Sequence, residues 1–172
     1  PVTRLRDVEI DLLHTQQVIF FFFKQKTAYE IMHSLVGSEI VEAQEQAIQK
    51  AIAAEQAFSA NKARPLEGIP VAIKDFTPTK GKPTTRGSKL LEDWVPDWNP
   101  VLVERLEAAG AIMVGKTNTP EFATSGFTDS PLWGVTRNPW DTSRTPGGSS
   151  GGAGAAVASG CVPFAEGTDM GG

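Results

Sequence analysis

A pair of serines set among glycines is the strongest chemical signal in this sequence. Ser149 and Ser150 lie in the segment PGGSSGGAG, at residues 146–154. Glycines allow backbone conformations that other residues avoid and let the backbone approach a substrate closely. A flexible linker has a similar composition, but this segment leads straight into a run of small residues that predicts a compact helix. The partially positive amides at the start of that helix would polarise an oxygen beside a serine hydroxyl.

A lysine at the end of an apolar segment is the second signal. Most lysines lie on the solvated surface, whereas Lys74 ends the segment IPVAIK and is followed by Asp75. Burial disfavours the ammonium form and lowers the pKa of a lysine, so a buried lysine can act as a base near neutral pH. A serine with a lysine, without histidine, is one arrangement for nucleophilic catalysis.

The composition argues against several other classes of function. The net charge is −4, with 16 basic and 20 acidic residues, so we expect no nucleic-acid partner. Only His14 and His33 are histidines, which does not favour a metal site. The longest apolar run, residues 18–23, is far shorter than the roughly 20 residues of a membrane span. Cys161, the only cysteine, cannot form an internal disulfide. We therefore expect a cytoplasmic protein without a membrane partner.

The elements that would position these side chains alternate between helix and strand. Helix formers fill residues 41–58, and β-branched residues predict a buried strand that ends at Lys74 and Asp75. An early proline and a following Gly110 predict a helix over residues 99–109. Residues 111–115 predict a second buried strand, so the pattern indicates α/β layering. In the first helix, the expected apolar stripe consists of Ile48, Ala51, Ile52, Ala54 and Phe58.

The segment GAIMVGKT, at residues 110–117, fits the letters of a phosphate-binding loop. That function needs a flexible loop between the glycines and a helix that begins at the lysine. Strand-forming residues fill the loop here, and Pro120 follows soon after Thr117. Backbone amides that are committed to a sheet cannot bind phosphates, so we do not expect nucleotide binding.

Residues 20–40 differ from the rest of the chain. The four phenylalanines at residues 20–23 fit neither helical nor strand periodicity. The segments KQKTAYEI and SLVGSE can be encoded by common short-read library adapters, and a poly-T run would encode the phenylalanines. We interpret residues 20–40 as translated sequencing adapter and set them aside. Residues 1–19 are left unassigned.

Four segments of the remaining chain together resemble the amidase signature family. In order they are PLEGIPVAIKD, LEAAGAIMVGKTNTPEF, TRNPWDTSRTPGGSSGGAGAAVASG and GTDMGG. The resemblance covers residues 41–172 and is specific, because separate blocks match in order with compatible spacing. It implies an α/β fold with a mixed β-sheet covered by helices. In that family the domain is much longer, so residues 41–172 would be its amino-terminal part.

The resemblance also implies a catalytic set of a lysine, a serine preceded by a cis peptide bond, and a nucleophilic serine. Lys74 matches the lysine and Ser149 matches the cis-serine, while Ser150 would steady the loop through hydrogen bonds. Neutral Lys74 would draw a proton through Ser149 from the nucleophile.

The remaining parts of the implied site lie at the end of the chain. The family forms its oxyanion hole from backbone amides of the TDxGG turn, which here are those of Met170, Gly171 and Gly172. The nucleophilic serine of the family comes next, so we expect it directly after Gly172 and expect the 172-residue chain alone to be inactive. No metal ion or organic cofactor is implied.

The resemblance implies an amidase that converts a small-molecule amide to an acid plus ammonia or an amine, through an acyl-enzyme. It allows a homodimer. One alternative is a glutaminase, similar to the subunit of a tRNA-dependent amidotransferase that releases ammonia from glutamine. Another is a non-catalytic fragment or binding protein on the same fold. The loop SGFTDSPLWGVTRNPW is more similar to that of stand-alone amidases, which favours the amidase.

Overall fold

A computed structural model describes residues 40–170, and for residues 40–45 only the backbone. The interpretations of residues 1–19 and 20–39 lie outside the described part of the chain. The helices and strands are α3 (Ile40–Ser59), β1 (Pro70–Lys74), η2 (Lys89–Leu91), α4 (Val101–Ala108), β2 (Ile112–Thr117), η3 (Glu121–Ala123), β3 (Asp129–Ser130), β4 (Gly134–Val135), α5 (Gly151–Ala158) and β5 (Phe164–Ala165), where η2 and η3 are short 3-10 helices.

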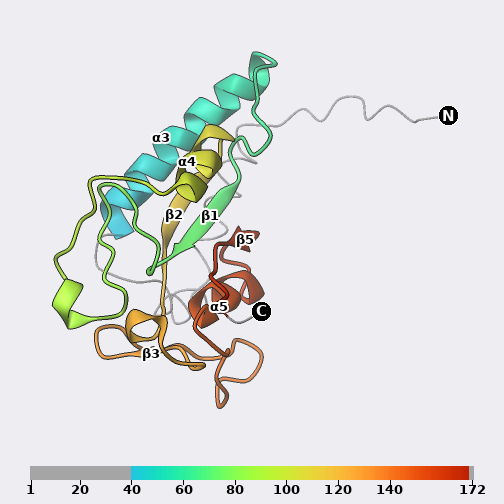
Figure 1. Cartoon of the computed structure of the whole chain (residues 1–172). Coiled ribbons are helices and arrows are strands. Elements are labelled where there is room, and N and C mark those ends of the chain that lie inside the picture. Colours follow the sequence, from blue (N-terminus) through green and yellow to red (C-terminus); the bar gives the residue numbers. More distant parts are fainter. Residues whose placement is uncertain (1–39, 171–172) are drawn as a thin grey trace.

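The central sheet has the strand order β2–β1–β5 (Figure 1), and both neighbours run parallel to β1. Strands β3 and β4 form a separate antiparallel pair. The expected α/β fold, with helices over a sheet, is confirmed. Both strands expected from the sequence are present, the first ending at Lys74 and the second extending to Thr117.

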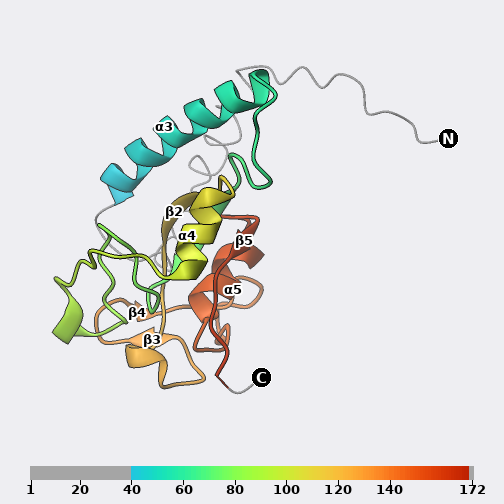
Figure 2. The ribbon, with the colours of Figure 1, turned by 45° about the horizontal axis from the view of Figure 1, so that its top comes forward.

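Side chains of β1 alternate between two layers of core, as the pleat of a strand requires. Val71 and Ile73 face the side of the sheet that α4 covers, whereas Ala72 faces α5. Helices α4 and α5 therefore cover opposite faces of β1, and Figure 2 shows these two helices together with β2 and β5. The α4 cluster also contains Val103 and Ala111, and the α5 cluster also contains Ala156 and Val162.

The face that α3 buries differs from the expected apolar stripe. Ala51 and Ala54 are buried, but Ile48, Ile52 and Phe58 are 43%, 45% and 49% exposed. Small side chains let this helix approach the chain below it, so that a Cβ placed on Gly68 would lie 3.3 Å from Cβ of Ala54. The small members of the expected stripe therefore pack inward, and its larger apolar members are exposed in the described part of the chain.

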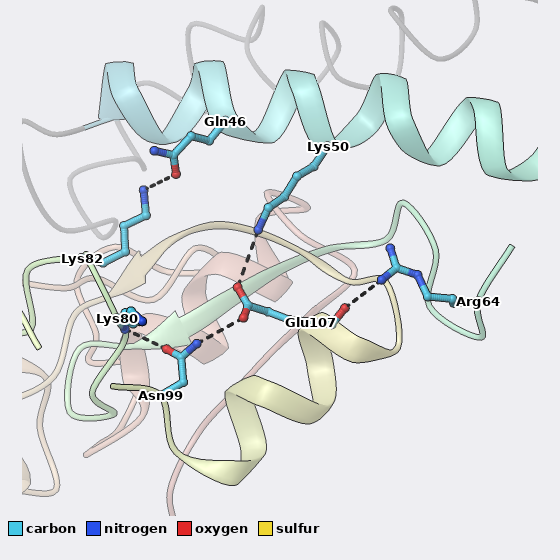
Figure 3. Close-up of polar contacts among 7 residues, drawn as sticks. All are labelled: Gln46, Lys50, Arg64, Lys80, Lys82, Asn99 and Glu107. Atoms are coloured by element: carbon cyan, nitrogen blue, oxygen red, sulfur yellow. Dashed lines mark hydrogen bonds and ion pairs between the residues drawn. The ribbon is translucent and has the colours of Figure 1, made fainter. Parts of the chain in front are cut away.

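Exposed polar contacts join α3 to α4 and to the loop after β1 (Figure 3). The Lys50 ammonium lies 3.6 Å from the Glu107 carboxylate, and Asn99 donates to the same carboxylate at 3.1 Å. Contacts of this kind at the surface contribute only about 0–1 kcal/mol each. The remaining drawn contacts are Lys82 to Gln46, the Lys80 amide to Asn99, and Arg64 to the Glu107 carbonyl.

The start of α5 is pressed against the end of β2. A Cβ on Gly152 would lie 2.4 Å from the carbonyl oxygen of Asn118, and one on Gly151 would lie 2.2 Å from Oγ1 of Thr128. Only glycine fits these two positions, whereas Gly154 has nothing within 4 Å of its Cβ position. The glycines that follow the serine pair therefore let the helix carry that pair to the sheet edge.

None of the helices within residues 40–170 has the length and apolar character that crossing a membrane requires.

We predict that Gly152→Ala destabilises the complete domain by roughly 1–3 kcal/mol, because the added methyl overlaps the Asn118 backbone. Urea denaturation measures this change in the free energy of unfolding. Gly154→Ala in the same helix is the matched control, and it should be neutral or stabilising by up to about 1 kcal/mol. Equal effects of the two substitutions would contradict the close packing described for α5.

Candidate functional site

The candidate site lies where the strands of the parallel sheet end. Lys74 is the last residue of β1 and has 0% exposure, and Thr117 ends the neighbouring β2. Glu166 directly follows β5 on the other side, and its amide donates to the Ala72 carbonyl at 2.8 Å. In open α/β sheets, ligands bind beyond the carboxyl ends of the strands. The serine pair precedes α5 and reaches the same edge.

The Lys74 side chain contacts three hydroxyl groups. Its Nζ lies 2.7 Å from Oγ of Ser149, 3.1 Å from Oγ of Ser150 and 2.7 Å from Oγ1 of Thr168. An ammonium has three donors and can satisfy all three contacts, whereas a neutral amine can accept one proton from a hydroxyl. Burial lowers the pKa of Lys74, and the negative charge of Glu166 opposes that shift.

The loop that carries Ser149 is fixed from both sides. The peptide bond between Gly148 and Ser149 is cis, the form that the family resemblance implies. Thr119 donates from its hydroxyl to the Ser149 carbonyl at 3.1 Å. Thr128 donates to the Gly147 carbonyl at 2.9 Å and accepts from the Gly151 amide at 3.0 Å. Two threonines thus secure the residues on each side of the serine pair.

Ser150 joins this loop to the turn that follows β5. Its Oγ accepts from the Thr168 amide and donates to the Thr168 carbonyl, both at 3.1 Å. Ser150 therefore has the loop contacts that a supporting role requires. Met170 is 100% exposed. Gly171 and Gly172 lie outside the described residues, so the oxyanion hole stays a prediction.

Asp75 is completely buried beside the site, and its carboxylate binds the loop after β1. It accepts from the Thr85 amide at 3.0 Å and from the Thr85 hydroxyl. Burial raises the pKa of Asp75, while the bonds from Thr85 and the charge of Lys116 lower it. The indole of Trp133 also donates to the Thr85 hydroxyl at 2.9 Å. Asp75 therefore anchors the loop after β1.

Lys116 is a second buried lysine at the same edge, opposite Ile73 in the register of β2 and β1. Its ammonium donates to the Thr77 carbonyl, to Thr79 at 2.9 Å and to Thr84 at 3.3 Å. Burial lowers its pKa to about 8, although Asp75 and Glu166 raise it. The expected strand through the phosphate-loop pattern is confirmed, and its lysine binds the protein's own loop.

Sequence reasoning found Lys74, Ser149 and Ser150, and the structure brings these three together. Sequence reasoning missed Thr168, which lies in the segment GTDMGG, and Glu166, which directly precedes that segment. A threonine or glutamate in a loop gives no local sign of a partner in a distant strand. Among the side chains of residues 46–170, no three His, Cys, Asp or Glu gather as ligands for a metal ion.

Comparison with known proteins shows which family the chain resembles. The sequence model described as Amidase matches residues 23–172. That match begins within residues 20–40, where the adapter interpretation stays a prediction. The A subunit of glutamyl-tRNA(Gln) amidotransferase from Lactiplantibacillus plantarum is 53% identical over 130 residues, covering 75% of this chain and 26% of the relative. The corresponding protein of Rhodopirellula baltica is 55% identical over 131 residues, covering 76% and 26%.

Comparison with solved structures points to the same family. A bacterial aryl acylamidase of the amidase signature enzymes family superposes with a TM-score of 0.77 at 29% identity, covering 88% of this chain and 31% of that one. The present chain spans about a quarter of the length of the curated relatives it matches.

We predict that Lys116 makes stability rise with pH in the alkaline range. The folded state binds its proton with a pKa of about 8, against 10.5 for a free lysine. Between those values the unfolded state binds more protons, so the free energy of unfolding increases with pH. Urea denaturation of the complete domain should show a shallower rise for Lys116→Met than for the unmutated protein.

Lys62→Met is the control, because Lys62 is exposed. The pH dependence of its stability should follow that of the unmutated protein. An unchanged profile for Lys116→Met would contradict the assignment to Lys116.

Proposed function

This chain belongs to the Amidase family, and we propose that the complete protein hydrolyses a carboxylic amide to an acid plus ammonia or an amine. One observation supports the proposal above all others, namely the 2.7 Å contact between the buried Lys74 amine and the Ser149 hydroxyl. The chain covers only 26% of its curated relatives, so activity and substrate are proposed for a longer protein.

Lys74 acts as the base in the proposed mechanism. Burial lowers its pKa and so increases the fraction of neutral amine near neutral pH. The neutral amine accepts the proton of the Ser149 hydroxyl, and Ser149 takes a proton from the attacking serine. That serine is proposed to follow Gly172 directly. Ser150 and Thr168 keep the amine aimed at Ser149 through their own contacts with Nζ.

The attacking oxygen adds to the amide carbonyl and gives a tetrahedral oxyanion. Backbone amides of Met170, Gly171 and Gly172 are proposed to donate to this oxyanion, where one donor is worth about 2.7–4 kcal/mol in a comparable enzyme. The proton returns through Ser149 to the leaving nitrogen as the carbon–nitrogen bond breaks. Water then attacks the acyl-enzyme, with Lys74 again as base, and releases the acid.

A glutaminase that works within an amidotransferase is the second candidate. It is supported by the relatives named as A subunits of glutamyl-tRNA(Gln) amidotransferase, which are 53% and 55% identical to this chain. In this candidate the amide is the side chain of glutamine, and the ammonia is used by partner subunits. The triad chemistry would be the same, so the contact of Lys74 with Ser149 does not separate the two candidates. A cytoplasmic location and a homodimer stay predictions.

We predict that Lys74→Ala lowers kcat of the complete protein by roughly 100- to 10,000-fold, because a general base contributes about that much. Steady-state kinetics measures the loss, and circular dichroism checks that the variant is folded. Lys62→Ala is the control, since Lys62 is exposed, and its kcat should match the unmutated value. Turnover retained by folded Lys74→Ala would show that the base is misassigned.

A substrate panel separates the candidates. The complete protein is assayed with aliphatic amides, aryl amides and glutamine, with and without amidotransferase partner subunits. We expect ammonia or amine release from simple amides without partners. Release from no substrate but glutamine, and only when partner subunits are present, would favour the second candidate. A residue other than serine after Gly172, with no turnover in any assay, would favour the non-catalytic alternative.

A further inference from the structure

We propose that Glu166 is a positioning residue that fixes Lys74 and sets the pH range in which Lys74 works as a base. The inference rests on the proposed function of Lys74. Glu166 takes no part in the proton relay described above, and its carboxylate binds the Lys74 amide and the Thr77 hydroxyl rather than the serine pair. Its effect on catalysis would pass through Lys74.

The contacts of Glu166 tie together the strand end and the loop that leaves it. Its Oε2 accepts from the Lys74 amide at 2.9 Å, and its Oε1 accepts from the Thr77 hydroxyl at 3.1 Å. The Thr77 amide in turn donates to the Lys74 carbonyl at 3.0 Å. Both oxygens of one carboxylate therefore engage the backbone of Lys74 and the turn after it. This arrangement fixes the point from which the Lys74 side chain reaches the hydroxyls.

The same carboxylate is a negative charge that acts on both buried lysines. It favours the protonated form of Lys74, against the effect of burial. It also favours the protonated form of Lys116, which reaches the Thr77 carbonyl from the other side. A charge in such a position stabilises an ammonium more than an exposed charge would, because less water screens it.

Other charged groups also lie near Lys74, and they are common to the unmutated protein and to a Glu166 variant. A comparison of the two therefore isolates Glu166. The Arg86 guanidinium stacks at 5.0 Å on the ring of Phe76, which lies 6.0 Å from Nζ of Lys74. The other groups are Asp75 beside Lys74, Lys116 on β2 and Asp169 in the turn after β5.

The direction of the effect follows from the role of the base. Only neutral Lys74 can accept a proton, so activity rises with pH as Lys74 loses its own proton. Glu166 favours the ammonium form of Lys74, so the rise in activity occurs at higher pH than it would without this charge. Removing the charge should move the acidic limb of the pH–rate profile to lower pH. A purely structural role would lower kcat at every pH and leave the limb in place.

The test uses Glu166→Gln in the complete protein, since glutamine has the same shape without the charge. We expect the acidic limb of kcat/KM to move to lower pH, with activity below the limb raised roughly two- to fivefold. Glu121→Gln is the matched control, because Glu121 is also half-buried and accepts from a hydroxyl, that of Ser88, at 2.7 Å. Its limb should not move.

A second measurement does not depend on turnover. Carbon NMR of lysine-labelled protein follows the Lys74 side chain, identified by the signal that Lys74→Ala removes. We expect its titration midpoint to fall in Glu166→Gln and to stay unchanged in Glu121→Gln. If Glu166→Gln does not fold, Glu166→Asp is measured instead, because its shorter side chain withdraws the charge from Lys74 and the midpoint should again fall.

An unchanged Lys74 midpoint in the folded Glu166 variant would overturn the inference. This result is distinct from a failure of the proposed function. If Lys74→Ala retained turnover while the Lys74 midpoint still responded to Glu166, the base would be misassigned and the electrostatic link would stand.

Discussion

The buried amine of Lys74 imposes the main constraint on this structure. A side chain with 0% exposure must find partners for its donors within the protein, because each unpaired buried polar group costs about 1–3 kcal/mol. Ser149, Ser150 and Thr168 supply those partners. They come from two segments, before α5 and after β5, so folding must bring both segments to the end of β1. The contacts that the proposed chemistry needs are therefore also contacts that the fold needs.

Small residues make that convergence feasible. The first turn of α5 approaches the backbone of Asn118 so closely that a Cβ on Gly152 would lie 2.4 Å from its carbonyl oxygen. Ala72 and Ala156 meet in the layer between β1 and α5, where larger side chains would separate strand and helix. Because α5 begins directly after Ser150, the depth of its packing sets how near the serine pair comes to Lys74.

Two buried lysines at one sheet edge differ in what surrounds them. Lys116 donates to a backbone carbonyl and to two threonine hydroxyls, and these contacts fix the loop after β1. A carbonyl can only accept, so it cannot pass a proton onward. The three partners of the Lys74 amine are hydroxyls, which can accept and donate in turn. Burial lowers the pKa of both lysines. What distinguishes Lys74, and suits it to the proposed proton transfer, is therefore its hydroxyl partners rather than its burial.

The sequence by itself determined the local features of this protein. Periodicity and turn residues indicated the alternation of helix and strand, the strand that ends at Lys74 and the glycine-rich loop around Ser149, because each depends on neighbours along the chain. Tertiary structure decided the rest. The bond between Glu166 and the Lys74 amide joins residues 92 positions apart and exists only because β5 pairs with β1. Likewise, α3 buries Ala51 and Ala54 while Ile48, Ile52 and Phe58 are exposed, a difference that the hydrophobic pattern along the helix does not predict.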